Sequence, residues 1–237
     1  MEAIERHKIR TFPNGYPWYK KLGAHITYYF SQIPLGRRKN LLTGKDISSV
    51  WKMIRHGDIL LVGNFQHSSA FFIDGIVTHA IAYIGKGRCI HAYAHGVAYI
   101  GLRKVLRQYD SCIVVRPYWK NDNQKYNFHT HLIEKIGKPY DFFFGIADEQ
   151  VTYFCTRLIN DSLIESHYHT GLESVRKEGN ILDQVLDKTY RAHRVLTPEQ
   201  MLKGNFQVII TSKNIIQDIN GYRLRDGKLN TILSQKD

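Results

Sequence analysis

The chain has 237 residues, of which 43% are hydrophobic and 23% are charged. This composition is close to the globular average and therefore excludes a fibrous chain or a wholly disordered one. The 33 basic and 21 acidic residues give a net charge of +12, which favours contact with an anionic partner such as a phospholipid surface or a cell-wall polymer. The basic residues are scattered and form no nucleic-acid-binding motif, so we expect no nucleic-acid partner.

The N-terminal 45 residues form a basic, aromatic-rich extension, within which the segment from Trp18 to Ile33 has no clean apolar stripe. This extension is expected to cap the domain or to touch a surface. Residues 46–212 are predicted to form the folded domain, and residues 213–237 a C-terminal tail. Neither a secretory leader nor an apolar stretch of 18 residues is visible, so we expect a cytoplasmic chain or one associated with a membrane surface.

The folded domain begins with an amphipathic helix, for which Asp46 is the expected N-cap and His56-Gly57 the end. Short apolar runs between glycine-containing turns predict strands at 58–62, 76–84, 88–93 and 112–116, with a last strand at 206–211. Helical spacing predicts helices at 102–109, 122–136 and 155–167, and a short helix opening at Pro198. These elements predict an α+β fold with one curved, mostly antiparallel sheet.

Cysteine usage points to a free thiol. Cys89, Cys112 and Cys155 cannot all pair within one chain, and their spacing differs from that of paired zinc ligands. Cys155 falls at the start of a predicted helix, where the helix N-terminus and a nearby histidine would lower the pKa of its thiol. The alternative interpretation is a small buried hydrophobe, which is the role expected of Cys89 and Cys112 in their strands.

Two histidines lie in neighbouring predicted strands. If the hairpin is centred at Gly85, His79 and His91 are paired across it and lie side by side on one face of the sheet. One imidazole could then act as a base while the other orients it. Twelve histidines in the chain leave open the alternative that these two are surface or satisfied core residues.

Several motifs in register resemble a known family over residues 56–212. The chain is similar to the YiiX/YebB-like branch of the permuted NlpC-type, papain-like hydrolases, in which the histidine strand precedes the cysteine helix. Lecithin retinol acyltransferase-like proteins share that order. The resemblance implies a circularly permuted papain-like fold with the catalytic cysteine at a helix N-terminus. It is carried by the segments HGDILLV, THAIAYIG, IHAYAHGV, LRKVLRQYDSCIVVRP, GKPYDFFF, YFCTRLI and TPEQMLKGNFQVI.

The resemblance also implies roles for individual residues. Cys155 matches the family nucleophile and His79 the family base, while His91 occupies the orienting position that often holds a glutamate in bacterial relatives. Tyr140 resembles an active-site tyrosine that lines the pocket or donates to the oxyanion, with a core aromatic as the alternative. No cofactor is implied.

The implied activity is a cysteine hydrolase that cleaves an amide or ester bond through a thioester acyl-enzyme. Its substrate would be a small-molecule, lipid or peptide acyl compound, with a cell-wall peptide or an N-acyl or lipid amide as the leading candidates. His91 and the net charge support a phospholipid acyltransferase or phospholipase as an alternative. A non-catalytic lipid- or peptide-binding module is a second alternative. A zinc site of His79, His91, His95 and Cys155 is a third, although its ligand spacing is unlike that of structural zinc sites.

Overall fold

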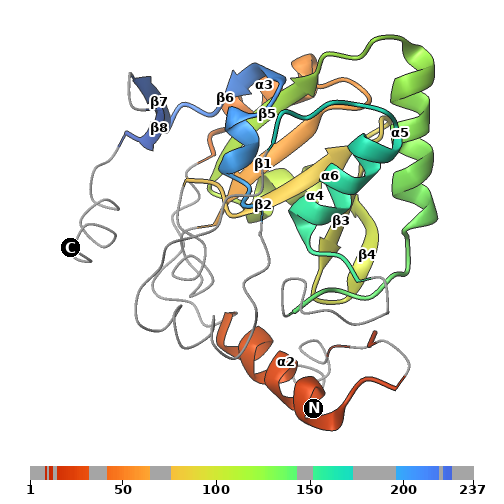
Figure 1. Ribbon diagram of the computed structural model, residues 1–237. Coiled ribbons are helices and arrows are strands. Elements are labelled where there is room, and N and C mark those ends of the chain that lie inside the picture. The colour runs from red at the N-terminus through yellow and green to blue at the C-terminus, as the bar shows by residue number, and fades with distance from the viewer. Residues whose placement is uncertain are drawn as a thin grey trace.

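The computed structural model describes residues 9, 11–12, 15–31, 42–64, 76–142, 152–172, 196–218 and 221–225. Within this part of the chain, six antiparallel strands form one sheet in the order β4-β3-β2-β1-β5-β6 (Figure 1). The strands are β1 (Ile59–Gly63), β2 (His79–Tyr83), β3 (Arg88–Tyr93), β4 (Gly96–Gly101), β5 (Ser111–Pro117) and β6 (Phe206–Thr211). The predicted α+β class and the mostly antiparallel sheet are confirmed.

Helices cover both faces of the sheet, so its central strands are apolar on both sides. On one face, Ile59 and Leu61 of β1 pack with residues of α5 (Asp122–Glu134) and α6 (Cys155–Glu165). On the other face, Leu60 and Val62 pack with residues of α3 (Gly44–Met53) and α4 (Leu102–Gln108). We refer to these as the α6 face and the α4 face.

The first domain helix starts differently from the prediction. Thr43, and not Asp46, is the N-cap of α3, because the Thr43 hydroxyl accepts a hydrogen bond from the Asp46 N–H at 3.2 Å. The Asp46 carboxylate accepts one in return from the Thr43 N–H at 2.8 Å. This reciprocal arrangement is a capping box, in which an acidic residue occupies the third helical position.

The β2–β3 hairpin is centred one residue later than predicted. Ala82 pairs with Ile90 and Tyr83 with Cys89, which places Lys86 and not Gly85 at the centre. The cause is a turn in which Gly85, Lys86 and Gly87 all have positive φ, a conformation that glycine adopts without steric cost. The shift makes His79 and His91 diagonal neighbours rather than direct partners.

Several elements outside the predictions complete the structure. The N-terminal segment forms α2 (Trp18–Ser31), and β4 extends the sheet beyond β3. In the C-terminal segment β7 (Ile215–Asp218) and β8 (Gly221–Leu224) form a separate two-stranded sheet. The short helix predicted to open at Pro198 is present before β6 as the 3-10 helix η2 (Gln200–Lys203). No helix in the described part of the chain has both the length and the apolar character needed to cross a membrane.

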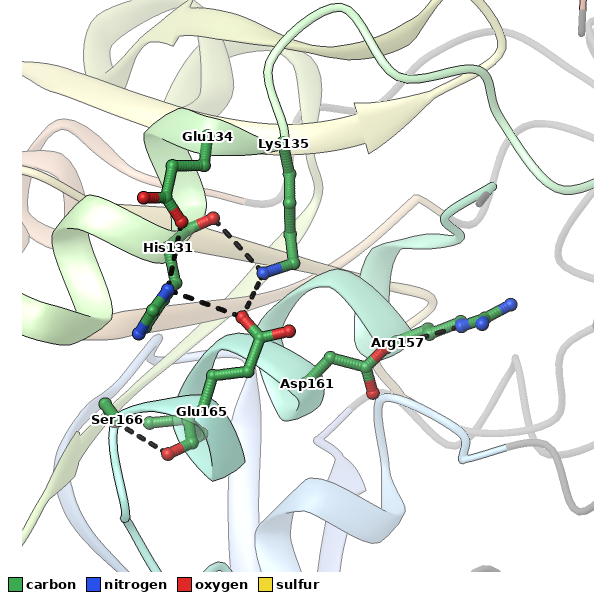
Figure 2. A network of polar contacts seen from close by, with 8 residues as sticks. His131, Glu134, Lys135, Arg157, Asp161, Glu165 and Ser166 are labelled. Atoms are coloured by element: carbon green, nitrogen blue, oxygen red, sulfur yellow. Dashed lines mark hydrogen bonds and ion pairs between the residues drawn. The ribbon is translucent and has the colours of Figure 1, made fainter. Parts of the chain in front are cut away.

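A polar network joins the C-terminal ends of α5 and α6 (Figure 2). The ammonium group of Lys135, which is buried, pairs with the Glu165 carboxylate and donates to the His131 carbonyl at 3.3 Å. His131 lies 3.0 Å from Glu134 and 3.6 Å from Glu165. These contacts help to fix α6, the helix that begins with Cys155.

Candidate active site

Cys155 is the first residue of α6, as predicted. Phe154 precedes it in an extended conformation and forms the N-cap, so the first N–H groups of the helix open toward the Cys155 side chain. The backbone N–H groups of Ala80, Thr156 and Cys155 itself interact with the sulfur. Because Ala80 belongs to β2, this contact joins the start of α6 to the strand that begins with His79.

The thiol of Cys155 is protonated at neutral pH in this arrangement. Burial raises its pKa to about 11, and the three N–H groups oppose that rise only in part. The expectation of a pKa below the ordinary thiol value is therefore wrong for the closed site. The free-energy cost of burying a charged thiolate is larger than the stabilisation that the N–H groups of the helix start and of Ala80 give to it.

The histidine pair is in direct contact. His79 Nε2 lies 3.1 Å from His91 Nδ1, and the two rings meet edge to face with centroids 5.3 Å apart. Burial, followed by the neighbouring His91, holds the pKa of His79 well below its ordinary value. Burial and the charge of Lys104 lower the pKa of His91 to about 4. Both imidazoles are therefore neutral near pH 7, which is the form that can accept a proton.

The two histidines and Cys155 do not share a face of the sheet, contrary to our expectation. His79 is paired with Val62 of the α4-face core, and His91 lies between Ile90 and Ala92, which point to the α6 face. The side chains of a strand alternate between faces, so both histidines point to the α4 side. Cys155 packs on the α6 face and contacts the backbone of Ala80, the residue that follows His79 at the start of β2.

Three tyrosines surround the cysteine and the histidines. Tyr109 stacks on His79 at 6.0 Å and 10°, and Tyr93 stacks on His91 at 5.9 Å and 3°. Burial is the main cause that raises the pKa of Tyr109 and Tyr140 well above the ordinary value, and the charge of a Cys155 thiolate adds to it in both. All three hydroxyl groups therefore lie near this sulfur or these rings. Tyr140 was predicted to line the site; Tyr93 and Tyr109 were not.

Tyr140 is held beside the approach to α6 by backbone contacts. It forms a parallel bridge with Tyr153, two residues before Cys155. The Asp141 N–H donates to the Tyr153 carbonyl at 3.1 Å, and the Tyr153 N–H donates to the Pro139 carbonyl at 3.0 Å. This pairing explains how a loop tyrosine reaches the cysteine.

The other two thiols belong to the opposite core. Cys89 and Cys112 pack on the α4 face with α3 and α4, and burial raises the pKa of each to about 12. Among the described residues, no three His, Cys, Asp or Glu side chains form a group able to hold a metal ion. Cys155 is thus the thiol at a helix start that contacts the backbone of β2, the strand that begins with His79.

A cysteine at a helix start, approached by a histidine strand that comes earlier in the chain, defines a permuted papain-like arrangement. Comparison with protein families matches residues 53–208 to the family described as "Permuted papain-like amidase enzyme, YaeF/YiiX, C92 family". The chain belongs to this family of cysteine amidases, which confirms the resemblance predicted from the motifs.

Comparison with solved structures matches the chain to the crystal structure of metalloprotein yiiX from Escherichia coli O157:H7. It shares 12% sequence identity with this chain at a TM-score of 0.49, and the alignment covers 68% of this chain and 98% of that one. Comparison with curated proteins finds no match.

Proposed function

We propose that this protein is a cysteine amidase in which Cys155 is the nucleophile, His79 the base and His91 the residue that orients the base. The observation that carries the proposal is the junction of α6 with β2, where the Ala80 amide contacts the Cys155 sulfur and the adjacent His79 contacts His91 at 3.1 Å. Nucleophile, base and orienting group then follow one another, as covalent acyl transfer requires.

The reaction begins when His79 accepts the thiol proton and the Cys155 sulfur attacks the amide or ester carbonyl. Because His79 Nε2 contacts His91, its Nδ1 is assigned to proton transfer with Cys155. The tetrahedral intermediate then collapses, the leaving amine or alcohol takes the proton from His79, and a thioester remains on Cys155. Water, deprotonated by His79, attacks the thioester, releases the carboxylic acid and restores the thiol.

Two kinds of donor are available to the oxyanion. The N–H groups of Cys155 and Thr156 lie at the start of α6, and the Tyr140 hydroxyl keeps its proton because its pKa is well above the ordinary value. Loss of one such donor typically costs about 3 kcal/mol of transition-state stabilisation. The substrate class we propose is a cell-wall peptide or an N-acyl or lipid amide.

Acyl transfer to an amine or alcohol is the second candidate, and the burial of the site favours it. Cys155 and His79 are each 7% exposed, and the stacked rings of Tyr93 and Tyr109 cover the histidines. A site that excludes water lets a thioester persist until another acceptor arrives. The two reactions are distinguished by product: hydrolysis yields a carboxylic acid, whereas transfer yields a new amide or ester when an acceptor is supplied.

The test combines a panel of peptide, N-acyl and lipid amide substrates with three variants. Cys155→Ala is expected to lower turnover by about 10³-fold or more, and His79→Ala by a comparable factor, because each removes an essential chemical role. His91→Gln is expected to retain more activity, with a loss of about 10- to 100-fold, since a glutamine amide still hydrogen-bonds the base.

Cys112→Ala serves as the matched control, because it removes a buried thiol that packs in the α4-face cluster and not in the cluster that contains Cys155. Its turnover should remain near that of the parent, and thermal melting of all variants separates lost chemistry from lost folding. Mass spectrometry of the parent should show a thioester on the peptide that contains Cys155. Full turnover by Cys155→Ala would exclude covalent thiol catalysis, and a non-catalytic binding module would take its place.

A further inference from the structure

One face of α2 carries a row of large apolar side chains that is open to solvent. Trp18, Tyr19, Leu22, Ile26 and Tyr29 expose 76%, 59%, 52%, 49% and 64% of their surface, respectively. Steps of four, four and three residues from Trp18 to Tyr29 keep these side chains on one side of a helix with 3.6 residues per turn. We call these five residues the α2 stripe. An exposed apolar patch of this kind marks an interaction site.

The opposite face of α2 packs on the domain next to the candidate active site. Ala24 and Tyr28 are buried in a cluster with Ile9 and Ala94. The Tyr28 ring lies 6.3 Å from the Tyr93 ring, which also contacts the rings of His79 and His91. These contacts turn the α2 stripe away from the domain, and Figure 1 shows α2 at one end of the molecule.

The chemistry of α2 is that of a helix lying in a membrane interface. Trp and Tyr favour the boundary between water and acyl chains, and Leu and Ile supply apolar area. Lys20 and Lys21 project on the two sides of the helix between its buried and exposed faces, and the helix contains no acidic residue. Its 14 residues span about 21 Å, which is less than the hydrocarbon thickness of a bilayer.

We propose that the α2 stripe docks this protein on an anionic lipid bilayer, with α2 lying parallel to the surface. Charge complementarity selects this occupant, since Lys20, Lys21 and the net charge of +12 attract anionic headgroups. A second copy of the chain fits less well, because self-association through this face would bring the lysines of both copies together.

Docking through α2 would place Tyr93, which stacks on His91 of the candidate site, near the lipid surface. Tyr28 touches Tyr93 from α2, and the Thr11 hydroxyl donates to the His95 carbonyl at 2.7 Å in the β3–β4 turn. The inference goes beyond the proposed amidase activity. Vesicle binding requires no turnover, so the two proposals fail independently.

The test is vesicle flotation of the full chain, with phosphatidylcholine alone and with phosphatidylglycerol added. The parent should bind the anionic vesicles, and binding should weaken with salt. Leu22→Glu/Ile26→Glu should lower partitioning by about a hundredfold, because two apolar contacts are lost and two carboxylates are repelled. Both positions are about half exposed, so the domain should melt at an unchanged temperature.

Tyr126→Glu/Ile133→Glu on α5 is the matched control, because it makes the same change in charge at two exposed apolar side chains far along the chain. Its partitioning should stay within about threefold of that of the parent, since net charge falls equally but the α2 stripe remains. Equal losses in both double variants would show that net charge alone drives binding and would overturn the proposal. Failure of the parent to bind anionic vesicles would overturn it as well.

Tryptophan fluorescence locates the contact. Addition of anionic vesicles should shift the parent emission to the blue, and Trp18→Phe should abolish the shift, whereas Trp51→Phe, at a tryptophan on α3, should retain it. Sedimentation velocity tests whether a second copy of the chain, and not a lipid surface, covers the α2 stripe. The α2 stripe would be assigned to self-association if the parent is a dimer that does not bind vesicles and if Leu22→Glu/Ile26→Glu converts this dimer to a monomer.

Discussion

The three thiols of this chain differ in what surrounds each sulfur. Cys155 contacts two backbone N–H groups at the start of α6 and the Ala80 N–H of β2, whereas Cys89 and Cys112 are enclosed by apolar side chains on the α4 face. Their pKa values follow this difference, at about 11 for Cys155 and about 12 for the other two. The environment thus distinguishes the candidate nucleophile even though all three thiols are protonated at neutral pH.

Cys155 should be the first thiol to react with iodoacetamide in the folded protein. A lower pKa gives more thiolate at any pH below both values, so labelling of Cys155 should be faster than that of Cys89 or Cys112. The rate should also rise with pH up to about 11. Peptide mapping after brief labelling measures the order, and faster modification of Cys89 or Cys112 would contradict the assignment of the nucleophile.

His79 and His91 make stability depend on pH in a definite direction. His91 has a pKa of about 4 in the folded chain and an ordinary value near 6.5 when unfolded, so between these values the unfolded state binds more protons. The free energy of unfolding should therefore fall as pH falls through this window, by about 2 kcal/mol at pH 4.5 from His91 alone. His79 adds a loss of the same sign.

Urea unfolding of the parent and of His91→Gln at pH 7 and pH 4.5 measures this contribution. The parent should lose more stability between the two pH values than His91→Gln, since glutamine takes up no proton. An equal loss in both proteins would mean that His91 is not held neutral by burial.

The site residues that could be predicted from the sequence are those that lie within a short sequence motif. Cys155, His79 and His91 each sit in a short segment whose helix or strand the sequence indicates, so motif and element together locate them. Tyr93 and Tyr109 gave no such signal. Tyr93 ends β3 and Tyr109 follows α4, and they meet the histidines only because strand alternation turns His79 and His91 toward the α4 face.

At the scale of whole elements, α2 shows why a helix can escape detection by periodicity. Its buried face contains Ala24 and Tyr28, while Leu22 and Ile26 lie on the exposed face, so apolar residues occur all round the helix. A search for one stripe with a polar opposite side finds none. The prediction of the β2–β3 register was wrong for another reason. Only the backbone conformation shows that Lys86, like Gly85 and Gly87, has a positive φ.

The junction of α5 and α6 offers a test of how a buried ion pair contributes. Lys135 is 5% exposed, and its ammonium pairs with Glu165, which is much more exposed. Glu165→Gln leaves a buried charge without a carboxylate and should lower the free energy of unfolding by about 1–3 kcal/mol. Lys135→Met removes the charge and keeps the volume, so its effect should stay within about 1 kcal/mol.

Chemical denaturation at neutral pH compares the two variants directly. The asymmetry is the informative quantity, because a simple surface ion pair would give two small and similar losses. A larger loss for Lys135→Met than for Glu165→Gln would show that the ammonium group, through its contacts with Glu165 and the His131 carbonyl, stabilises the fold by more than its burial costs.

At the scale of the whole molecule, the predicted strands and helices indicated the α+β class, and the family resemblance indicated the permuted papain-like arrangement. Apolar runs of strand length and helical spacing are local signals, and β3 and β6 fall at the predicted residues. The order of strands in the sheet was not predicted, because it depends on contacts between distant segments. In particular, β1 lies between β2 and β5, and β6 covers the far edge of β5.

The hairpin β7–β8 extends the main core beyond the predicted domain boundary at residue 212. Ile215 and Leu224 are 6% and 5% exposed and belong to the core cluster of the α6 face. Asn214, just before β7, donates to the Asp110 carbonyl at 2.8 Å and so connects the hairpin to the segment that precedes β5. Because of these contacts, we expect the hairpin to unfold together with the domain.

Leu224→Ala should therefore lower the free energy of unfolding by about 2–4 kcal/mol, and Ile215→Ala by a similar amount, because each leaves a cavity in the main core. Gln217→Ala, at an exposed position of the same hairpin, is the matched control and should stay within about 0.5 kcal/mol. Urea unfolding followed by far-ultraviolet circular dichroism gives the three values. If the hairpin is an independent appendage, Leu224→Ala will leave the main transition unchanged, whereas a hairpin that shares the core will shift the single transition of the whole domain.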